Sequence, residues 1–217
     1  WIAEEYDPLV NLDKLTYAGN LDSRASLAGH PRHTFVEGDI GDGPLLHRLF
    51  EEHRPRAVVH FAAESHVDRS IADPDAFVRT NCDGTNVVCD VARQHEVERF
   101  LHISTDEVYG SVEEGSSLET DPLEPRSPYS ASKAGSDLIA LSYHTTYGLP
   151  VLVTRSSNNF GPYQFPEKVI PLFTTNLLVG KNVPMYGDGM KIRDWCFVED
   201  NCAGVDTVLR RGRVGEV

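Results

Sequence analysis

A tyrosine and a lysine four residues apart are the side chains of this chain best suited to proton transfer. On a helix, Tyr129 and Lys133 would lie one turn apart on the same face. We expect the ammonium of Lys133 to favour the phenolate of Tyr129 and so to lower the pKa of the phenol. Such a phenol can take a proton from an alcohol and later return it. The spacing alone is common on exposed helices, so the surrounding residues must decide.

The string Ser104-Thr105-Asp106-Glu107 stands upstream of this pair. It follows the β-rich run of residues 99–103 and would therefore lie at the carboxyl end of a strand. Open α/β sheets bind their ligands at that edge. The pattern indicates a site that combines two carboxyl groups with the tyrosine and the lysine.

These residues resemble a known family. Ser104, Tyr129 and Lys133 resemble the catalytic trio of the extended short-chain dehydrogenases/reductases. The run Thr-Asp-Glu-Val-Tyr-Gly at 105–110 is similar to that of the nucleotide-sugar 4,6-dehydratases, especially those that act on dTDP-glucose. The resemblance extends from Asp13 to about residue 215. It implies a lyase of deoxysugar biosynthesis that uses NAD and a nucleotide-bound hexose.

The resemblance also implies a role for each side chain. Tyr129 would take the C4 hydroxyl proton while NAD accepts the C4 hydride, and Thr105 would polarise the C4 oxygen. Glu107 would then remove the C5 proton, Asp106 would protonate the departing C6 hydroxyl, and the hydride would return to C6. Elimination of water needs one base and one acid at neighbouring carbons. Because adjacent residues on a strand face opposite ways, we expect the backbone to turn at Asp106.

The same resemblance assigns binding residues. Asp13 would follow a strand at residues 9–12, where an acidic residue bonds the adenosine ribose and favours NAD over NADP. The residues expected to contact NAD are Asp13, Lys14, Leu15, Thr16, Asp39, Ile40, Ala62, Ala63, Ser65, Thr80, Ser104, Tyr129, Lys133 and Asn159. Those expected to contact the substrate are His66, Thr105, Asn158, Lys168, Tyr186 and Arg193. The guanidinium fork of Arg193 suits a diphosphate.

Strands alternate with helices along the chain, which predicts an α/β fold with a Rossmann-like, doubly wound parallel sheet. Strands are expected at 9–12, 34–36, 56–63, 99–104 and 150–154, and helices near 45–50, 73–93, 129–147 and 199–211, with a loop at 111–128. Prolines become frequent after Gly161, so we expect an NAD-binding domain at 1–161 and part of a small substrate-binding region at 162–217. The helices at 74–93 and after Tyr129 carry surplus apolar residues, and in this family such helices pair with their copies, so we expect a homodimer.

One expected motif is missing. The glycine-rich turn that holds the pyrophosphate should lie about 20 residues before the ribose-binding acid. Only 12 residues precede Asp13, and the first glycine is Gly19. We therefore expect this sequence to be an internal fragment of a longer enzyme.

Composition narrows the class of partner. The chain has 20 Lys and Arg against 33 Asp and Glu, a net charge of −13, which argues against nucleic acid or an anionic membrane as partner. None of the four cysteines forms a C-x-x-C motif, so we expect no metal site and a reducing cytoplasm. There is neither a signal-peptide pattern nor an apolar run of about 18 residues.

Three alternatives remain open at this point. A nucleotide-sugar 4-epimerase or decarboxylase of the same fold needs the Tyr-Lys pair, but it has no use for the carboxyl pair at 106–107. A UDP-glucose 4,6-dehydratase would differ only in the nucleobase. A non-catalytic domain that binds a nucleotide sugar or a protein is supported only by the missing glycine turn.

Overall fold

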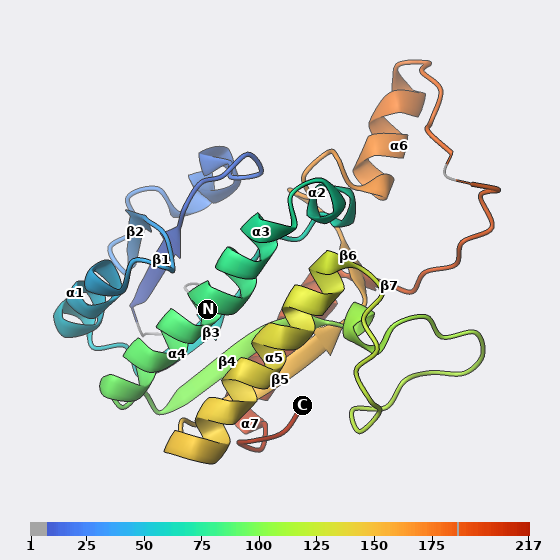
Figure 1. Cartoon of the computed structure of the whole chain (residues 1–217). Coiled ribbons are helices and arrows are strands. Elements are labelled where there is room, and N and C mark those ends of the chain that lie inside the picture. The colour runs from blue at the N-terminus through green and yellow to red at the C-terminus, as the bar shows by residue number, and fades with distance from the viewer. Residues whose placement is uncertain (1–7, 186) are drawn as a thin grey trace.

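The computed structural model describes residues 8–185 and 187–217 and shows the predicted alternation of strands and helices (Figure 1). The strands are β1 (Leu9–Asp13), β2 (His33–Glu37), β3 (Ala57–His60), β4 (Arg99–Thr105), β5 (Val151–Ser156), β6 (Asn158–Phe160) and β7 (Trp195–Phe197). The α-helices are α1 (Gly43–His53), α2 (Val67–Ala72), α3 (Pro74–Phe77), α4 (Thr85–Gln94), α5 (Pro128–Tyr147), α6 (Val169–Leu178) and α7 (Val198–Arg211). Two 3₁₀ segments, η1 (Leu21–Leu27) and η3 (Asp106–Tyr109), and one π-helical segment, η2 (Val78–Gly84), complete the order.

Every strand pair in the described residues is parallel. The pairs form the sheets β1-β2, β3-β4-β5 and β6-β7. In the central sheet Thr105 lies beside Ser156, so the carboxyl ends of β4 and β5 meet at one edge. The predicted α/β fold with parallel sheets is confirmed.

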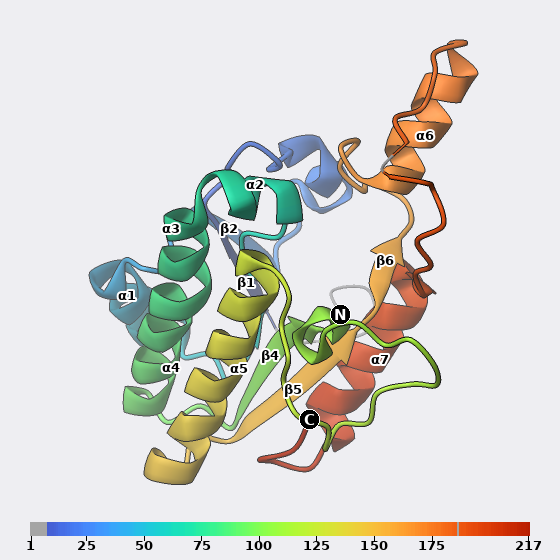
Figure 2. The same cartoon turned by 45° about the vertical axis from the view of Figure 1, so that its right-hand side comes forward.

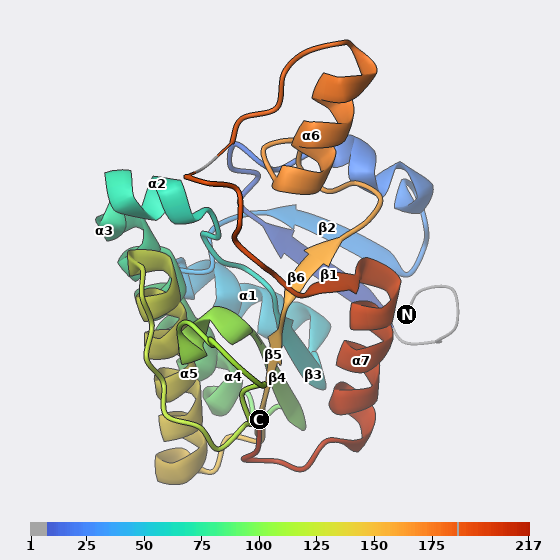
Figure 3. The same ribbon diagram turned by 90° about the vertical axis from the view of Figure 1, so that its right-hand side faces the viewer.

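Helices cover both faces of the central sheet. Helices α4 and α5 lie side by side on one face, and α7 lies on the other (Figure 3). Successive residues of β4 serve the two layers: Phe100 packs in the core with Val88, whereas Leu101 packs against Val205 of α7. This alternation follows from the pleat of a strand covered on both sides.

Local signals fix the two ends of α5. The Ser127 side chain accepts from the Ser130 amide, and Ser130 Oγ accepts in return from the Ser127 amide, which forms a capping box with proline at the first helical position. Gly148 ends the helix with φ 76°, a conformation that glycine adopts readily. Tyr129 is therefore held in the first turn, next to the carboxyl end of the sheet.

The strand expected at 56–63 is shorter than predicted. It spans only Ala57–His60, and residues 61–66 form a loop. Val58 and Val59 pack against core clusters on opposite faces, as expected, but stay half-buried, and His60 is the one fully buried residue of the strand. The reason is that β3 bonds β4 along one edge and no strand among the described residues along its other edge.

The helix expected at 73–93 begins at Pro74 and is helical from there on, but it is not uniform. Between α3 and α4 the chain makes the wide turns of the π-helix η2. Such segments are rare and are often found at functional sites. Gly84, at the end of η2, lies so close to Ile40 that an added Cβ would be 2.6 Å from Ile40 Cδ1. Apolar periodicity cannot reveal this change of pitch.

The last third of the chain only partly separates from the sheet. Helix α6 projects away from the sheet layers (Figure 2), whereas α7 packs on β4 and β5. The division at residue 161 stays a prediction. Among the described helices, none combines the length and the apolar character that crossing a bilayer requires.

Candidate active site

The expected backbone turn is present after β4. Thr105 ends the strand, and its Oγ1 accepts from the Glu107 amide at 3.2 Å, which caps the 3₁₀ segment η3. Asp106 and Glu107 form the first turn of η3 and are half-buried, while the side chain of Val108 is fully buried beneath them. The turn thus brings both carboxyl groups to the carboxyl end of the sheet.

The environment treats the two carboxyl groups differently. Burial raises the pKa of Asp106, Asp194 raises it further, and a hydrogen bond with Thr105 opposes them. Burial and the charge of Asp106 raise the pKa of Glu107, but the positive charges of Arg193 and Lys168 lower it. Cations therefore offset the shift at Glu107, whereas a further acid adds to the shift at Asp106.

Tyr129 does not have the predicted lowered pKa. Burial raises its pKa, the nearby carboxyl group of Glu107 adds to the shift, and Thr105 opposes it. The ammonium of Lys133 is directed elsewhere, because its Nζ donates to the Ile103 carbonyl at 2.7 Å. Lys133 is 4% exposed, and burial lowers its pKa to about 8 in spite of Asp137. The predicted shift of Tyr129 is wrong because burial and carboxylates outweigh the lysine.

A buried polar network that sequence reasoning missed lies beneath the lysine. Arg155 Nε donates to Asp137 Oδ2 at 2.9 Å, and another nitrogen of Arg155 donates to the Tyr109 hydroxyl at 2.7 Å. His102 Nε2 lies 3.0 Å from Ser136 Oγ and 3.3 Å from Asp137 Oδ1. Burial raises the pKa of Asp137, but its interactions with His102, Ser104 and Arg155 outweigh burial, and the pKa falls below its usual value. The available signal was Asp137, one turn after Lys133.

Asn81 is a second buried polar residue that the sequence analysis missed. It is 1% exposed and holds the loop 61–66, because it accepts from the Glu64 amide at 2.8 Å and donates to the Glu64 carbonyl at 3.0 Å. It also donates to Ser132 of α5 at 2.8 Å. An asparagine within an apolar helical stretch was the signal, since buried amides need partners. This loop carries Ala62 and Ala63, both half-buried, and Thr80 precedes Asn81 in η2.

The structure brings the first group of predicted NAD contacts together at the ends of β1 and β2. Asp13 accepts from the Leu15 amide at 2.8 Å, and Lys14 pairs with Asp39 at 2.6 Å. Leu15 has a positive φ of 50°, and the Thr16 carbonyl accepts from Gly19 in the turn that follows. The side chain of Ile40 is different: it is 9% exposed and belongs to the apolar core.

Predicted substrate contacts approach the carboxyl pair from the last third of the chain. Lys168 Nζ donates to the Ser65 carbonyl at 3.2 Å, and Arg193, which is exposed, lies near enough to Glu107 to lower its pKa. Asn158 and Asn159 lie on β6, and buried Asn159 Oδ1 has no hydrogen-bond partner among the described residues. Tyr186 lies outside the described residues.

A cluster around Glu167 joins these parts. Glu167 accepts from the Tyr17 hydroxyl at 2.9 Å and lies 3.8 Å from His66 Nε2 and 3.5 Å from Arg69 Nε. His66 also caps α2, where its Nδ1 accepts from the Arg69 amide at 3.4 Å. The Glu167 carboxylate, just before α6, thus contacts both the loop after β1, which carries Tyr17, and helix α2 with its cap residue His66.

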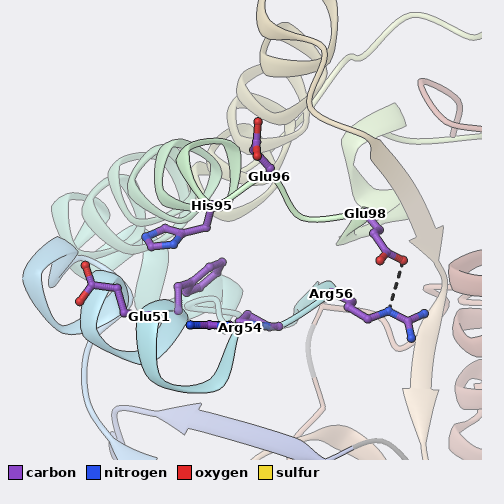
Figure 4. Close-up of a pocket in the computed structure, with 8 residues that line it drawn as sticks. Glu51, Arg54, Arg56, His95, Glu96 and Glu98 are labelled. Carbon is purple, nitrogen blue, oxygen red and sulfur yellow. Dashed lines mark hydrogen bonds and ion pairs between the residues drawn. The ribbon is translucent and has the colours of Figure 1, made fainter.

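A hollow of about 500 Å³ lies elsewhere in the molecule (Figure 4). Its lining includes Arg54, Arg56, His95 and Glu98, which precede or begin β3 and β4. It therefore lies at the amino ends of these strands, and the candidate site lies at their carboxyl ends. The carboxyl pair and the Tyr-Lys pair lie at the carboxyl ends, away from this hollow.

Comparison with known proteins agrees with this geometry. The family model described as GDP-mannose 4,6 dehydratase matches residues 2–217. A dTDP-glucose 4,6-dehydratase of Streptomyces antibioticus is 61% identical over 206 residues, which cover 95% of this chain and 60% of the relative. One from Xanthomonas campestris is 56% identical over 96% of this chain and 62% of the relative. The chain thus spans about three fifths of the length of these relatives.

Solved structures give the same result. DesIV, a dTDP-glucose 4,6-dehydratase of Streptomyces venezuelae solved with NAD and TYD bound, has a TM-score of 0.95 and 54% identity, covering 98% of this chain and 66% of that one. A UDP-glucose 4-epimerase of Thermotoga maritima has a TM-score of 0.88 at 29% identity, covering 96% of this chain and 67% of that one. The fold is thus shared with epimerases, while the identity is greater to the dehydratases. The chain belongs to the GDP-mannose 4,6 dehydratase family, which confirms its resemblance to the nucleotide-sugar 4,6-dehydratases.

Proposed function

We propose that the intact protein is an NAD-dependent hydro-lyase that converts dTDP-glucose to dTDP-4-keto-6-deoxyglucose. The observation that carries this proposal is the pair Asp106 and Glu107, half-buried on one 3₁₀ turn beside Tyr129. A 4-epimerase has no step that needs such a pair. The relatives named dTDP-glucose 4,6-dehydratase support the choice of nucleobase.

The residues present fit NAD at both of its ends. Exposed Asp13 lies at a strand end where it can bond ribose hydroxyls, and no arginine follows it in the turn at 14–20. Asn159 Oδ1 is a buried acceptor whose lack of a partner among the described residues suits a bound amide or hydroxyl. When bound, NAD supplies the group that accepts a hydride from the sugar and returns it. The DesIV structures with NAD bound support this choice of cofactor.

Tyr129 and Thr105 would act at the C4 hydroxyl. In the structure Tyr129 is a protonated phenol, because burial and Glu107 raise its pKa. A positive charge bound beside Tyr129 would oppose the carboxylates and lower the pKa of the phenol. More of the tyrosine would then be phenolate, the form that accepts a proton. Lys133, whose pKa is lowered to about 8, lies one turn further along the helix.

Electrostatics divides the work of elimination between the carboxyl groups. Burial and Asp106 raise the pKa of Glu107, and Arg193 and Lys168 oppose that rise, so these cations suit Glu107 to act as the base for the C5 proton. Burial and Asp194 raise the pKa of Asp106 and the hydrogen bond with Thr105 opposes them, so Asp106 would act as the acid for the C6 hydroxyl. Two neighbouring carboxyl groups with different surroundings are the arrangement that acid–base elimination requires.

Lys168 and Arg193 would also hold the diphosphate, with His66 and Asn158 nearer the sugar. Lys168 is half-buried with its amine on the Ser65 carbonyl, and exposed Arg193 can offer two donors to phosphate oxygens. Each positive charge thus serves substrate binding and the ionisation of Glu107.

We also propose that the protein is a cytoplasmic homodimer. The outer faces of η2 and α5 expose Val78 by 50% and Leu138 by 60%, and these segments pack together on one side of the sheet. All four cysteines are free, which suits a reducing compartment. Light scattering at micromolar concentration should give twice the monomer mass, and a monomer would contradict the dimer.

One assay tests the proposed function. The intact protein is mixed separately with dTDP-glucose and UDP-glucose, and the sugar is analysed by mass spectrometry and NMR. Loss of one water with a C4 ketone from dTDP-glucose is the expected result. An epimer of unchanged mass would indicate a 4-epimerase. Faster loss of water from UDP-glucose would indicate that UDP-glucose, not dTDP-glucose, is the preferred substrate. Binding without reaction would indicate a non-catalytic domain.

A further inference from the structure

The carboxyl groups of η3 need a fixed direction, and the ends of the segment provide only part of it. Thr105 caps the first turn, and the Val108 carbonyl accepts from the Glu124 amide at 2.9 Å. Gly110 ends the segment with φ 86°, where a side chain would collide with the Glu124 carbonyl. Thr105 also interacts with Tyr129 at the start of η3, but these contacts do not connect the last residue of η3 to α5.

Arg155 supplies that connection. From β5 it donates to the hydroxyl of Tyr109, the last residue of η3, at 2.7 Å, and its guanidinium carbon lies 4.9 Å from the centre of the tyrosine ring. Its Nε donates to Asp137 at 2.9 Å. The Arg155 and Asp137 side chains are 6% and 0% exposed. A guanidinium fork reaches both partners at once, which the single ammonium of lysine does less well.

Asp137 lies on the same face of α5 as the proton-transfer pair. It comes one turn after Lys133 and two turns after Tyr129. The series Tyr109, Arg155 and Asp137 therefore joins the turn that carries Asp106 and Glu107 to the helix that carries Tyr129.

We infer that Arg155 is a positioning residue that holds η3 in register with α5, so that the carboxyl pair and Tyr129 face neighbouring carbons of one sugar. The inference rests on the proposed function. Arg155 itself reaches the reaction only through Tyr109 and Asp137. A misplacement of about 1 Å can cost roughly 100-fold in rate, so a loosened η3 slows elimination before it affects binding.

Tyr109→Phe in the intact protein is the direct test, because it removes only the hydroxyl and leaves the Arg155–Asp137 pair in place. Tyr143→Phe is the matched control: Tyr143 lies on α5 and its hydroxyl donates to Asn86 at 3.0 Å, on an exposed surface. Three quantities are compared: amide hydrogen exchange of residues 106–110, the rate of C4 oxidation by reduced-nicotinamide absorbance, and the rate of water loss by rapid quench.

For Tyr109→Phe we expect faster amide exchange in η3 and water loss slowed about tenfold or more, up to the 100-fold scale of a 1 Å displacement. C4 oxidation and KM should stay near the wild-type values, and Tyr143→Phe should match the wild type throughout. Arg155→Lys should show the same pattern more strongly. Unchanged exchange in η3, or equal slowing of both steps, would overturn the inference. Amide exchange needs no substrate, so it tests the link even if the wild-type protein proves not to be a dehydratase.

Discussion

Asp137→Asn measures what the buried ion pair with Arg155 contributes to stability. Asparagine has nearly the shape of aspartate but no charge, so the substitution leaves the guanidinium buried without its counter-charge. Asp137 is 0% exposed and accepts at 2.9 Å, so solvent cannot replace it. Removing one partner of such a pair costs about 3–5 kcal/mol, a large share of the roughly 5–15 kcal/mol that keeps a domain folded.

The double variant separates a lost interaction from an unpaired charge. Adding Arg155→Met to Asp137→Asn removes both charges, so a good part of the cost should be recovered, with a coupling free energy of up to about 3 kcal/mol. The matched control is Asp90→Asn on α4. Asp90 pairs with Arg93 at 2.7 Å, but the two side chains are 40% and 36% exposed, so we expect a much smaller loss of stability than for Asp137→Asn.

Urea unfolding followed by circular dichroism, at one protein concentration, gives these free energies. If Asp137→Asn costs no more than Asp90→Asn, burial does not have the effect claimed for it. If the double variant is as unstable as the sum of the single variants, the two charges do not depend on each other.

The same pair gives a signed dependence on pH. Interactions with His102, Ser104 and Arg155 hold the pKa of Asp137 below its unfolded value in spite of burial. The folded state therefore binds fewer protons than the unfolded state, and the stability from this group is present above the unfolded pKa and is lost as pH falls through the folded pKa. The difference between wild type and Asp137→Asn should shrink as pH falls below about 4. A difference that stays constant in this range would contradict the lowered pKa.

Three further predictions concern the reaction. Glu107→Gln should leave C4 oxidation intact and slow water loss by about 100-fold or more, whereas Tyr129→Phe should slow the oxidation itself. Rapid-quench analysis with reduced-nicotinamide absorbance distinguishes the two steps. Water loss at the normal rate in Glu107→Gln would show that Glu107 is not the base. Because Arg193 lowers the pKa of Glu107, Arg193→Met should move the acid limb of the pH profile of the elimination rate to higher pH. An unchanged profile would show that the charge of Arg193 does not affect the pKa of Glu107. Glu167→Gln should raise KM roughly tenfold with a smaller change in kcat, because a charged hydrogen bond of about 1.5–3 kcal/mol from Tyr17 to Glu167 orders the loop after β1. Steady-state kinetics of Tyr17→Phe, which should give the same KM as Glu167→Gln, provides the check.

Short-range signals predicted most of the fold. The β-rich run at 99–103 and the cap residues Ser127 and Gly148 act within a few residues, so β4 and α5 appear close to where they were expected. The turn at Asp106 followed from the geometry of a strand, which cannot aim two adjacent side chains the same way. Asp106 directly follows β4 and Tyr129 lies in the first turn of α5, so both stand at the carboxyl end of the sheet.

The remaining features depend on partners distant in sequence. Arg155 and Tyr109 are 46 residues apart, and Asn81 and Ser132 are 51 apart, so no local pattern links them. The pKa of Tyr129 depends on burial, which is set only when the chain has packed, whereas the spacing in the sequence points to Lys133 alone. The short β3 likewise reflects an edge that composition cannot reveal.

The π-helical segment η2 makes the number of residues in its helix matter more than their identity. A π turn holds about one residue more than an α turn. Deleting one residue within 78–84 would let α3 and α4 join as a regular helix with little change in their relative rotation, because a π turn that loses its extra residue becomes an α turn. The residues of the segment itself would shift, however, and Asn81 would lose its hydrogen bonds to Glu64 and Ser132. This segment should therefore accept substitutions at exposed positions such as Arg79 far better than deletions.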